Sequence, residues 1–302
     1  MGYVPDPALN ALRVYRKELK PSQDRSTIAV IENWPRKGLT EWNGPSKIVF
    51  KGAIARAEKL GYKVEPFWMR EFKSHRKASD ALYSRGVKGL ILESLPQGLG
   101  HLCLQWERFC TVSYSYDFVL PRFHRLAFDD FGHMIDLRRK LAQRGYKRPG
   151  FVLNKRNERA SRYCSLAANV FWESRHKLVR KPIPILMVSD TKEIAQDLVT
   201  WFRTFRPDVI VGHNSAIFHV LLDQGIRIPE EVAFVSREVL ETETSLTGFK
   251  ANHRNIGAVA INLLHAMIAR GEYGIPEVPQ TILISNDWNE GTTAPQRNDH
   301  RC

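Results

Sequence analysis

The chain has 302 residues, 43% of them hydrophobic, and a formal net charge of +13. This length can hold two α/β lobes with substantial cores, while apolar runs such as 87–92 are far too short to span a bilayer. The positive charge attracts phosphates and polyanions, although the basic residues are spread along the whole chain. No secretory pattern opens the sequence, and the four cysteines lack metal-ligand spacing. We therefore expect a cytoplasmic protein with free thiols, no membrane segment, no metal and no cofactor.

The first 25 residues combine a helix start with leucines and bases. Pro5 and Pro7 end any preceding helix, and Asp6 can cap a new helix that begins at Pro7. The side chains that follow are two leucines on one face and then three bases: Leu9, Leu12, Arg13, Arg16 and Lys17. An exposed leucine flanked by bases suits a wedge in the minor groove of DNA. An amphipathic helix or a frayed tail is the alternative interpretation.

Strands and helices then alternate along the chain in two series. After a polar linker at 21–26, the first series has strands at 27–31, 64–68, 87–92, 109–114 and 125–128, with helices at 46–61 and 78–85. The second series has helices at 135–144, 160–173, 194–205 and 217–224, with strands at 149–153, 183–188, 208–212 and 232–235. A helix at 256–270 and a strand at 281–285 complete the pattern. Such alternation predicts two doubly wound lobes with parallel sheets, whose ligand lies at the carboxyl ends of the strands.

Several segments, in order, resemble the lactose-repressor (LacI) family from Tyr3 to about Thr293. They are Tyr3-Val-Pro-Asp-Pro-Ala-Leu-Asn-Ala-Leu12, Phe128-Asp-Asp130, Leu141-Ala-Gln-Arg-Gly-Tyr146, Gly225-Ile-Arg-Ile-Pro-Glu-Glu-Val232, Leu246-Thr-Gly-Phe249, Asn255-Ile-Gly-Ala-Val-Ala260 and Trp288-Asn-Glu-Gly-Thr-Thr293. The resemblance implies type I periplasmic-binding-protein-like lobes behind a short hinge helix. On this basis we expect hinge and linker at 1–25, an N-terminal lobe at 26–128 plus 246–271, a C-terminal lobe at 129–245 plus 272–295, and a tail at 296–302.

The resemblance also implies that the hinge contacts DNA. Tyr3 and Pro5 hold the family's places, Asp6 replaces the usual Asn, Leu9 stands where Ala is usual, and Leu12 falls on the groove-inserting leucine. We expect the DNA contacts to come from Tyr3, Leu9, Leu12, Arg13 and Arg16. A family member carries a helix-turn-helix headpiece upstream of this hinge, whereas this sequence starts at Met1. We therefore expect either a truncated sequence or a misassigned start, and weak, unselective DNA binding by the chain as given.

Planar hydrogen-bonding side chains and aromatic faces mark candidate effector residues. Arg159 and Arg162 follow the strand at 149–153, where guanidinium groups can grip hydroxyls or a carboxylate. Either arginine is alternatively plain surface charge. Asn214 follows the strand at 208–212 and can cap the next helix, bind a ligand, or do both. Trp34 and Trp42 can stack on a ligand or pack beneath a loop.

The resemblance adds four further candidates. Asp129 matches an aspartate where the chain crosses between lobes and can serve the hinge or the ligand. His253 lies near a pocket position at the return crossing, although a lone histidine is more often structural. Arg237 and Glu238 stand where family members commonly place an aspartate directed at sugar hydroxyls. That change of charge leaves room for an acidic or otherwise unusual effector.

No catalytic motif is present, because the sequence lacks a nucleophile elbow, a Walker loop and a zinc-protease pattern. We therefore predict a non-enzyme: a homodimeric transcription regulator that binds a small, sugar-like effector and controls operator DNA binding through the hinge helix. The alternative is a periplasmic-type sugar receptor for a transporter. The missing signal peptide argues against this alternative.

Overall fold

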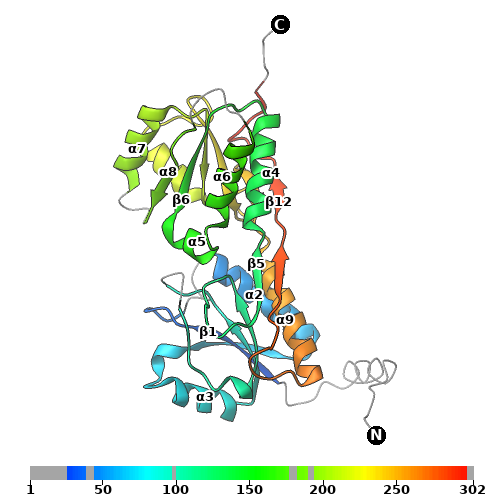
Figure 1. Ribbon diagram of the computed structural model, residues 1–302. Helices are drawn as coiled ribbons and strands as arrows, with labels where there is room; N and C mark the ends of the chain where they lie inside the picture. Colours follow the sequence, from blue (N-terminus) through cyan, green and yellow to red (C-terminus); the bar gives the residue numbers. More distant parts are fainter. Residues whose placement is uncertain (1–25, 39–43, 97–99, 177–181, 190–193, 298–302) are drawn as a thin grey trace, which may run out of the picture. The chain divides into compact units, whose positions relative to one another are not determined.

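A computed structural model describes residues 26–38, 44–96, 100–176, 182–189 and 194–297. The chain divides into two compact units (Figure 1). Of the described residues, unit 1 contains those within 26–127 and 253–282, and unit 2 contains those within 128–252 and 283–297. Each unit contains a six-stranded sheet, so the prediction of two α/β lobes with mainly parallel sheets is confirmed.

The sheet of unit 1 has the strand order β11-β5-β4-β3-β1-β2. Its strands are β1 (Thr27–Glu32), β2 (Lys63–Trp68), β3 (Val87–Leu92), β4 (Cys110–Tyr114), β5 (His124–Phe128) and β11 (Thr281–Ile284), and its helices are α2 (Pro45–Lys59), α3 (His75–Ser84) and α9 (His253–Arg270). Alternate strand residues face opposite sides of the sheet. Ala29, Ile31 and Leu90 therefore pack in one buried cluster with Ala78 and Leu82 of α3. Short 3-10 turns follow β2 (Met69–Glu71) and precede β4 (Trp106–Arg108).

Helices α2 and α9 pack against each other in unit 1, although they are far apart in the sequence (Figure 1). A glycine on each helix permits this close approach. A β-carbon on Gly52 would lie 2.0 Å from the carbonyl oxygen of Arg254, and one on Gly257 would lie 2.0 Å from that of Val49. Because both neighbours are backbone atoms, neither position can accept a larger residue without moving a helix.

The sheet of unit 2 has the strand order β12-β10-β9-β8-β6-β7. Its elements are β6 (Pro149–Asn154), β7 (Leu186–Val188), β8 (Val209–Gly212), β9 (Ala233–Val239), β10 (Thr247–Lys250) and β12 (Asp287–Asn289), with α4 (Asp130–Gln143), α5 (Lys155–Ala160), α6 (Cys164–Arg175), α7 (Ile194–Phe205) and α8 (Ser215–Asp223). Neighbouring strands of this sheet are parallel, except that β10 and β12 are antiparallel.

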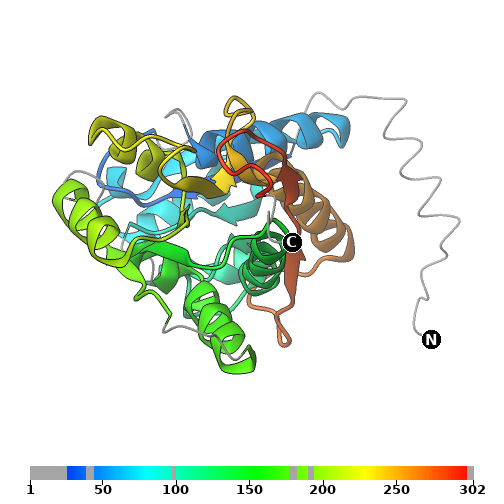
Figure 2. The same cartoon turned by 90° about the horizontal axis from the view of Figure 1, so that it is seen from above.

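Helices lie on both faces of the unit 2 sheet (Figure 1 and Figure 2). An apolar cluster fills the space between the sheet and the helices on each face. Ile210 and Phe234 pack with residues of α7 and α8, whereas Val211 and Val235 pack with residues of α4 and α6. This alternation follows from the two-residue period of a strand, and it explains why buried parallel strands are apolar on both sides.

The structure differs from the sequence predictions in several elements. The helix predicted at 160–173 is α6, which begins only at Cys164, because Arg162 (φ 55°) and Tyr163 (φ 60°) adopt the left-handed conformation before it. The short helix α5, which ends at Ala160, was not predicted. The strand predicted at 183–188 shortens to β7, and β9 runs on to Val239. Strand β12 was missed, since three residues give too short a pattern.

The unit boundaries also differ from the predicted ranges at two of the crossings. Residues 246–252 lie in unit 2, because β10 pairs with β9 of that sheet. Residues 272–282 lie in unit 1 and lead into β11, which lies beside β5. Among the described residues, no helix is both long and apolar enough to cross a membrane.

Candidate functional site

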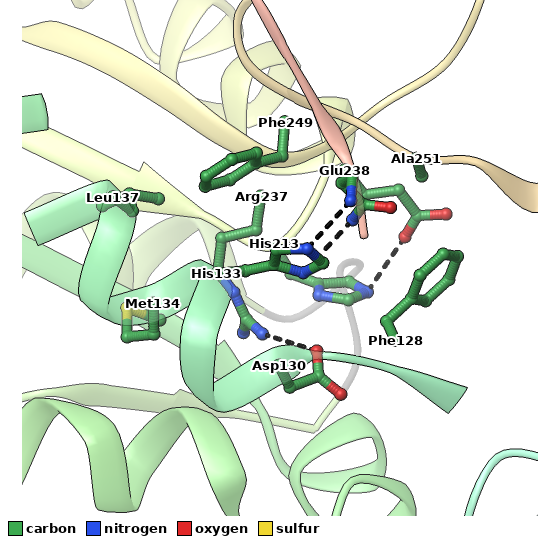
Figure 3. A pocket seen from close by; sticks show the side chains of 11 residues that line it. Phe128, Asp130, His133, Met134, Leu137, His213, Arg237, Glu238, Phe249 and Ala251 are labelled. Carbon is green, nitrogen blue, oxygen red and sulfur yellow. Dashed lines mark hydrogen bonds and ion pairs between the residues drawn. The ribbon is translucent and has the colours of Figure 1, made fainter. Parts of the chain in front are cut away.

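A cavity of about 50 Å³ lies in unit 2, beside the ends of its parallel strands (Figure 3). Arg237 and Glu238 come from the last part of β9, and His213 directly follows β8. Helix α4 contributes Asp130 and His133. The remaining wall is mostly apolar and includes Phe128, Met134, Leu137, Phe249 and Ala251. The carboxyl ends of parallel strands are where α/β folds bind ligands, because loops and helix starts converge there.

Arg237 joins three helices of unit 2 through its guanidinium group. Nη2 lies 3.4 Å from Asp130 Oδ1 in α4, and Nη1 lies 3.4 Å from Glu158 Oε1 in α5. Nη2 also donates a hydrogen bond to Ser165 Oγ in α6. Only 12% of the Arg237 side chain and 1% of the Glu158 side chain are exposed. The arginine is therefore held by the protein's own acceptors.

The carboxyl group of Asp130 is difficult to ionise. Burial raises the pKa of Asp130 to about 6, because the charged form loses solvation. Arg237 opposes this rise, whereas the negative charges of Glu158, Asp129 and Glu238 add to it. Desolvation is thus the main cause of the rise, and the neighbouring carboxylates add to it.

Two histidines face the cavity from different elements. His213 Nε2 lies 3.3 Å from Glu238 Oε2 (Figure 3). His133 Nε2 accepts a hydrogen bond of 2.9 Å from the backbone N–H of Asn286. Nitrogen Nε2 of His133 therefore carries a lone pair, and the ring is neutral with its proton on Nδ1. Burial is also the main cause that lowers the pKa of His133.

The predicted effector residues of unit 2 fall into two groups. Arg237 and Glu238 line the cavity, whereas Arg159 and Arg162 are exposed and do not line it. The remaining two residues are helix caps beside cavity residues. Asp129 Oδ1 accepts from the N–H of Gly132 at the start of α4, and Asn214 Oδ1 accepts from that of Ala216 at the start of α8.

The other predicted residues lie elsewhere. Trp34 belongs to unit 1, where its indole N–H donates to the carbonyl oxygen of Ser94 at 2.8 Å. His253 begins α9 in the same unit and is buried. Trp42 lies outside the described residues, and so do the predicted DNA contacts Tyr3, Leu9, Leu12, Arg13 and Arg16.

Sequence reasoning did not select Asp130, His133, His213 or Glu158 as site residues. For His213 a signal exists, since it directly follows the apolar strand β8 and directly precedes Asn214. Glu158 carries no local signal, because its partner Arg237 is 79 positions away. Within the described ranges, no three His, Cys, Asp or Glu side chains are arranged to hold a metal ion.

Comparison with known proteins agrees with this architecture. Residues 139–293, just over half of the chain, match the periplasmic binding protein-like domain. The chain therefore belongs to the periplasmic binding protein-like domain family. No match is found among the curated proteins.

Solved structures of LacI-family regulators share the fold. A LacI-family transcriptional regulator from Rhizobium etli is 18% identical, with a TM-score of 0.69 over 90% of this chain and all of that one. The regulator CcpA from Weissella paramesenteroides, solved with bound glucose, is 16% identical, with a TM-score of 0.66 over 90% and 100% of the two chains. The lac repressor dimer bound to operator and the anti-inducer ONPF is 14% identical, with a TM-score of 0.65 over 97% and 100%.

Proposed function

We propose that this protein is a transcription regulator that responds to a small, sugar-like effector. The observation that carries the proposal is the cavity beside the strand ends of unit 2. It combines hydrogen-bonding groups (Asp130, His213, Glu238) with the aromatic rings of Phe128 and Phe249. A polyol presents hydroxyls together with an apolar ring face, so both features match it. The LacI-family regulators of the same fold, one holding glucose, support this class of function.

Effector binding is tested by thermal unfolding with neutral mono- and disaccharides, glucose among them. A ligand at a hundred times its Kd stabilises the folded protein by about 2.7 kcal/mol and raises the melting temperature. We expect His213→Ala to abolish that rise, since His213 lines the cavity. His219→Ala is the matched control, because His219 is exposed on α8. No rise with any sugar, or a rise that survives His213→Ala, would refute the effector site.

We further propose that the protein binds operator DNA in the cytoplasm as a homodimer, through Tyr3, Leu9, Leu12, Arg13 and Arg16. The sequence pattern supports this part, as does the lac repressor dimer on its operator, whose fold this chain shares. The test measures the affinity of the full chain for duplex DNA at low salt and then compares Leu12→Ala with wild type. Weaker DNA binding at unchanged effector affinity is the expected result, because a minor-groove wedge is lost. Equal DNA affinity of the two proteins would exclude the wedge, and sedimentation would test the dimer.

A further inference from the structure

The charge of the cavity wall differs from that of the whole chain. In a protein with a formal charge of +13, the lining holds two carboxylates, Asp130 and Glu238, and one permanent cation, Arg237. The carboxylates of Glu158 and Asp129 act on the same wall, because both raise the pKa of Asp130. The local surplus of negative charge is therefore a property of this cavity and not of the composition.

The single arginine does not present its charge to a ligand. Its guanidinium group donates to Ser165 and lies 3.4 Å from both Asp130 and Glu158. An acidic effector would have to compete with two protein carboxylates for the same donors. The change to Arg237 therefore does not create a site for an acid, contrary to one reading of the sequence.

Two histidines also line the cavity: His213, which lies 3.3 Å from Glu238 and offsets its charge only when protonated, and His133. His133 is neutral, because its Nε2 accepts the Asn286 N–H. Glu238, 16% exposed, and Asp130, 28% exposed, are the two carboxylates that line the cavity. A carboxylate has about four lone-pair sites, so it can accept from several donors at once, a ligand's among them.

We infer that the cavity takes the ammonium group of an amine-bearing ligand, with Glu238 and Asp130 as the acceptors. This inference rests on the proposed function and specifies the effector as an amine-bearing polyol, for example an amino sugar. An ammonium group has three donors and no acceptor, which matches a wall of carboxylate oxygens. The cavity of about 50 Å³ has room for a few water molecules, and an ammonium group with one or two carbons is of that size.

Small probes of matched shape test the inference directly. Ethanolamine and ethylene glycol differ only by an ammonium group in place of a hydroxyl, and acetate supplies the opposite charge. Each is titrated into the full chain while the imidazole signals of His133 and His213 are followed by NMR. We expect ethanolamine to half-saturate at a concentration about tenfold below that of ethylene glycol, which corresponds to about 1.4 kcal/mol. Acetate should give no saturable shift.

A variant of Glu238 and a measurement of proton release on binding test whether the ammonium group binds at these two carboxylates. Glu238→Gln keeps the size of the side chain and should reduce the preference for ethanolamine over ethylene glycol to about threefold or less. Glu230→Gln, at an exposed position, should leave this preference unchanged. Binding of a cation should also lower the pKa of Asp130, whose charged neighbours are Arg237, Glu158, Asp129 and Glu238. Calorimetry near pH 6 in buffers of different ionisation enthalpy should therefore detect proton release, even if Glu238→Gln fails to fold.

Equal curves for ethanolamine and ethylene glycol, or no shift with either, would overturn the inference. So would a preference that persists in Glu238→Gln, because the acceptor would then lie elsewhere. These outcomes are separable from failure of the proposed function. A neutral sugar that stabilises the wild type but not His213→Ala upholds the effector site whether or not amines are preferred.

Discussion

Replacement of Arg237 by methionine tests whether the cluster that it forms holds unit 2 together. Methionine keeps most of the aliphatic volume and removes the charge. Glu158 is then left with 1% of its side chain exposed and without its cationic neighbour, while Asp130 loses the one positive charge that lowers its pKa. Breaking a buried ion pair by removing one partner costs about 3 to 5 kcal/mol, because the remaining charge stays buried. We expect a loss of this size.

The assay is urea denaturation of wild type and variants at neutral pH. Arg227→Met is the matched control, since Arg227 pairs with Glu231 at the surface, and it should unfold like wild type. The double variant Arg237→Met with Glu158→Gln should be more stable than the sum of the single losses predicts, by roughly 0.5 to 3 kcal/mol, because the amide removes the unbalanced charge. A loss below about 1 kcal/mol in Arg237→Met, or strict additivity in the double variant, would refute this account of the cluster.

Three further results are expected. Gly52→Ala should destabilise the protein by about 1 to 3 kcal/mol or more in urea denaturation, since the new methyl group would meet the carbonyl oxygen of Arg254; a stability equal to wild type would disprove the tight helix crossing. Asp130→Asn should flatten the pH dependence of the free energy of unfolding. In the wild type the pKa of Asp130 is raised from 3.8 to about 6 on folding, so this group contributes roughly 3 kcal/mol of stability at low pH, which is lost as the pH rises from about 4 to 6. An unchanged pH profile in Asp130→Asn would contradict the raised pKa. Trp34→Phe should lower the free energy of unfolding by about 1 kcal/mol, because the hydrogen bond to Ser94 is lost, and it should leave effector affinity in calorimetry unchanged. Reduced affinity would show that Trp34 contributes to effector binding.

The strands and their faces were predictable because their signal is local. Val209, Ile210 and Val211 are β-branched and consecutive, and the structure sends alternate members to opposite clusters. The break between α5 and α6, which moves the start of the helix predicted at 160–173 to Cys164, was not predictable in this way. Arg162 and Tyr163 adopt positive φ without a glycine to announce the turn.

The candidate site was predictable in position but not in chemistry. Sequence reasoning placed Arg237 and Glu238 at a strand end, where the cavity lies. It could not show that the counter-ions of Arg237 come from positions 79 and 107 residues away, because such pairs depend on how distant helices pack. Arg159 and Arg162 are exposed and do not line this cavity, so their contact with a ligand stays a prediction.

The close packing of α2 against α9 has a consequence for synthesis of the protein. Helix α9, the partner of α2, leaves the ribosome only after all of residues 128–252 have been made. The apolar face of α2 formed by Val49, Ala53 and Ala57 therefore stays exposed during most of translation. Exposed apolar surface on an incomplete polypeptide invites aggregation and engages chaperones. A nascent chain stopped before residue 253 should therefore bind holdases and resist folding, whereas one that extends past residue 282 can close its first unit.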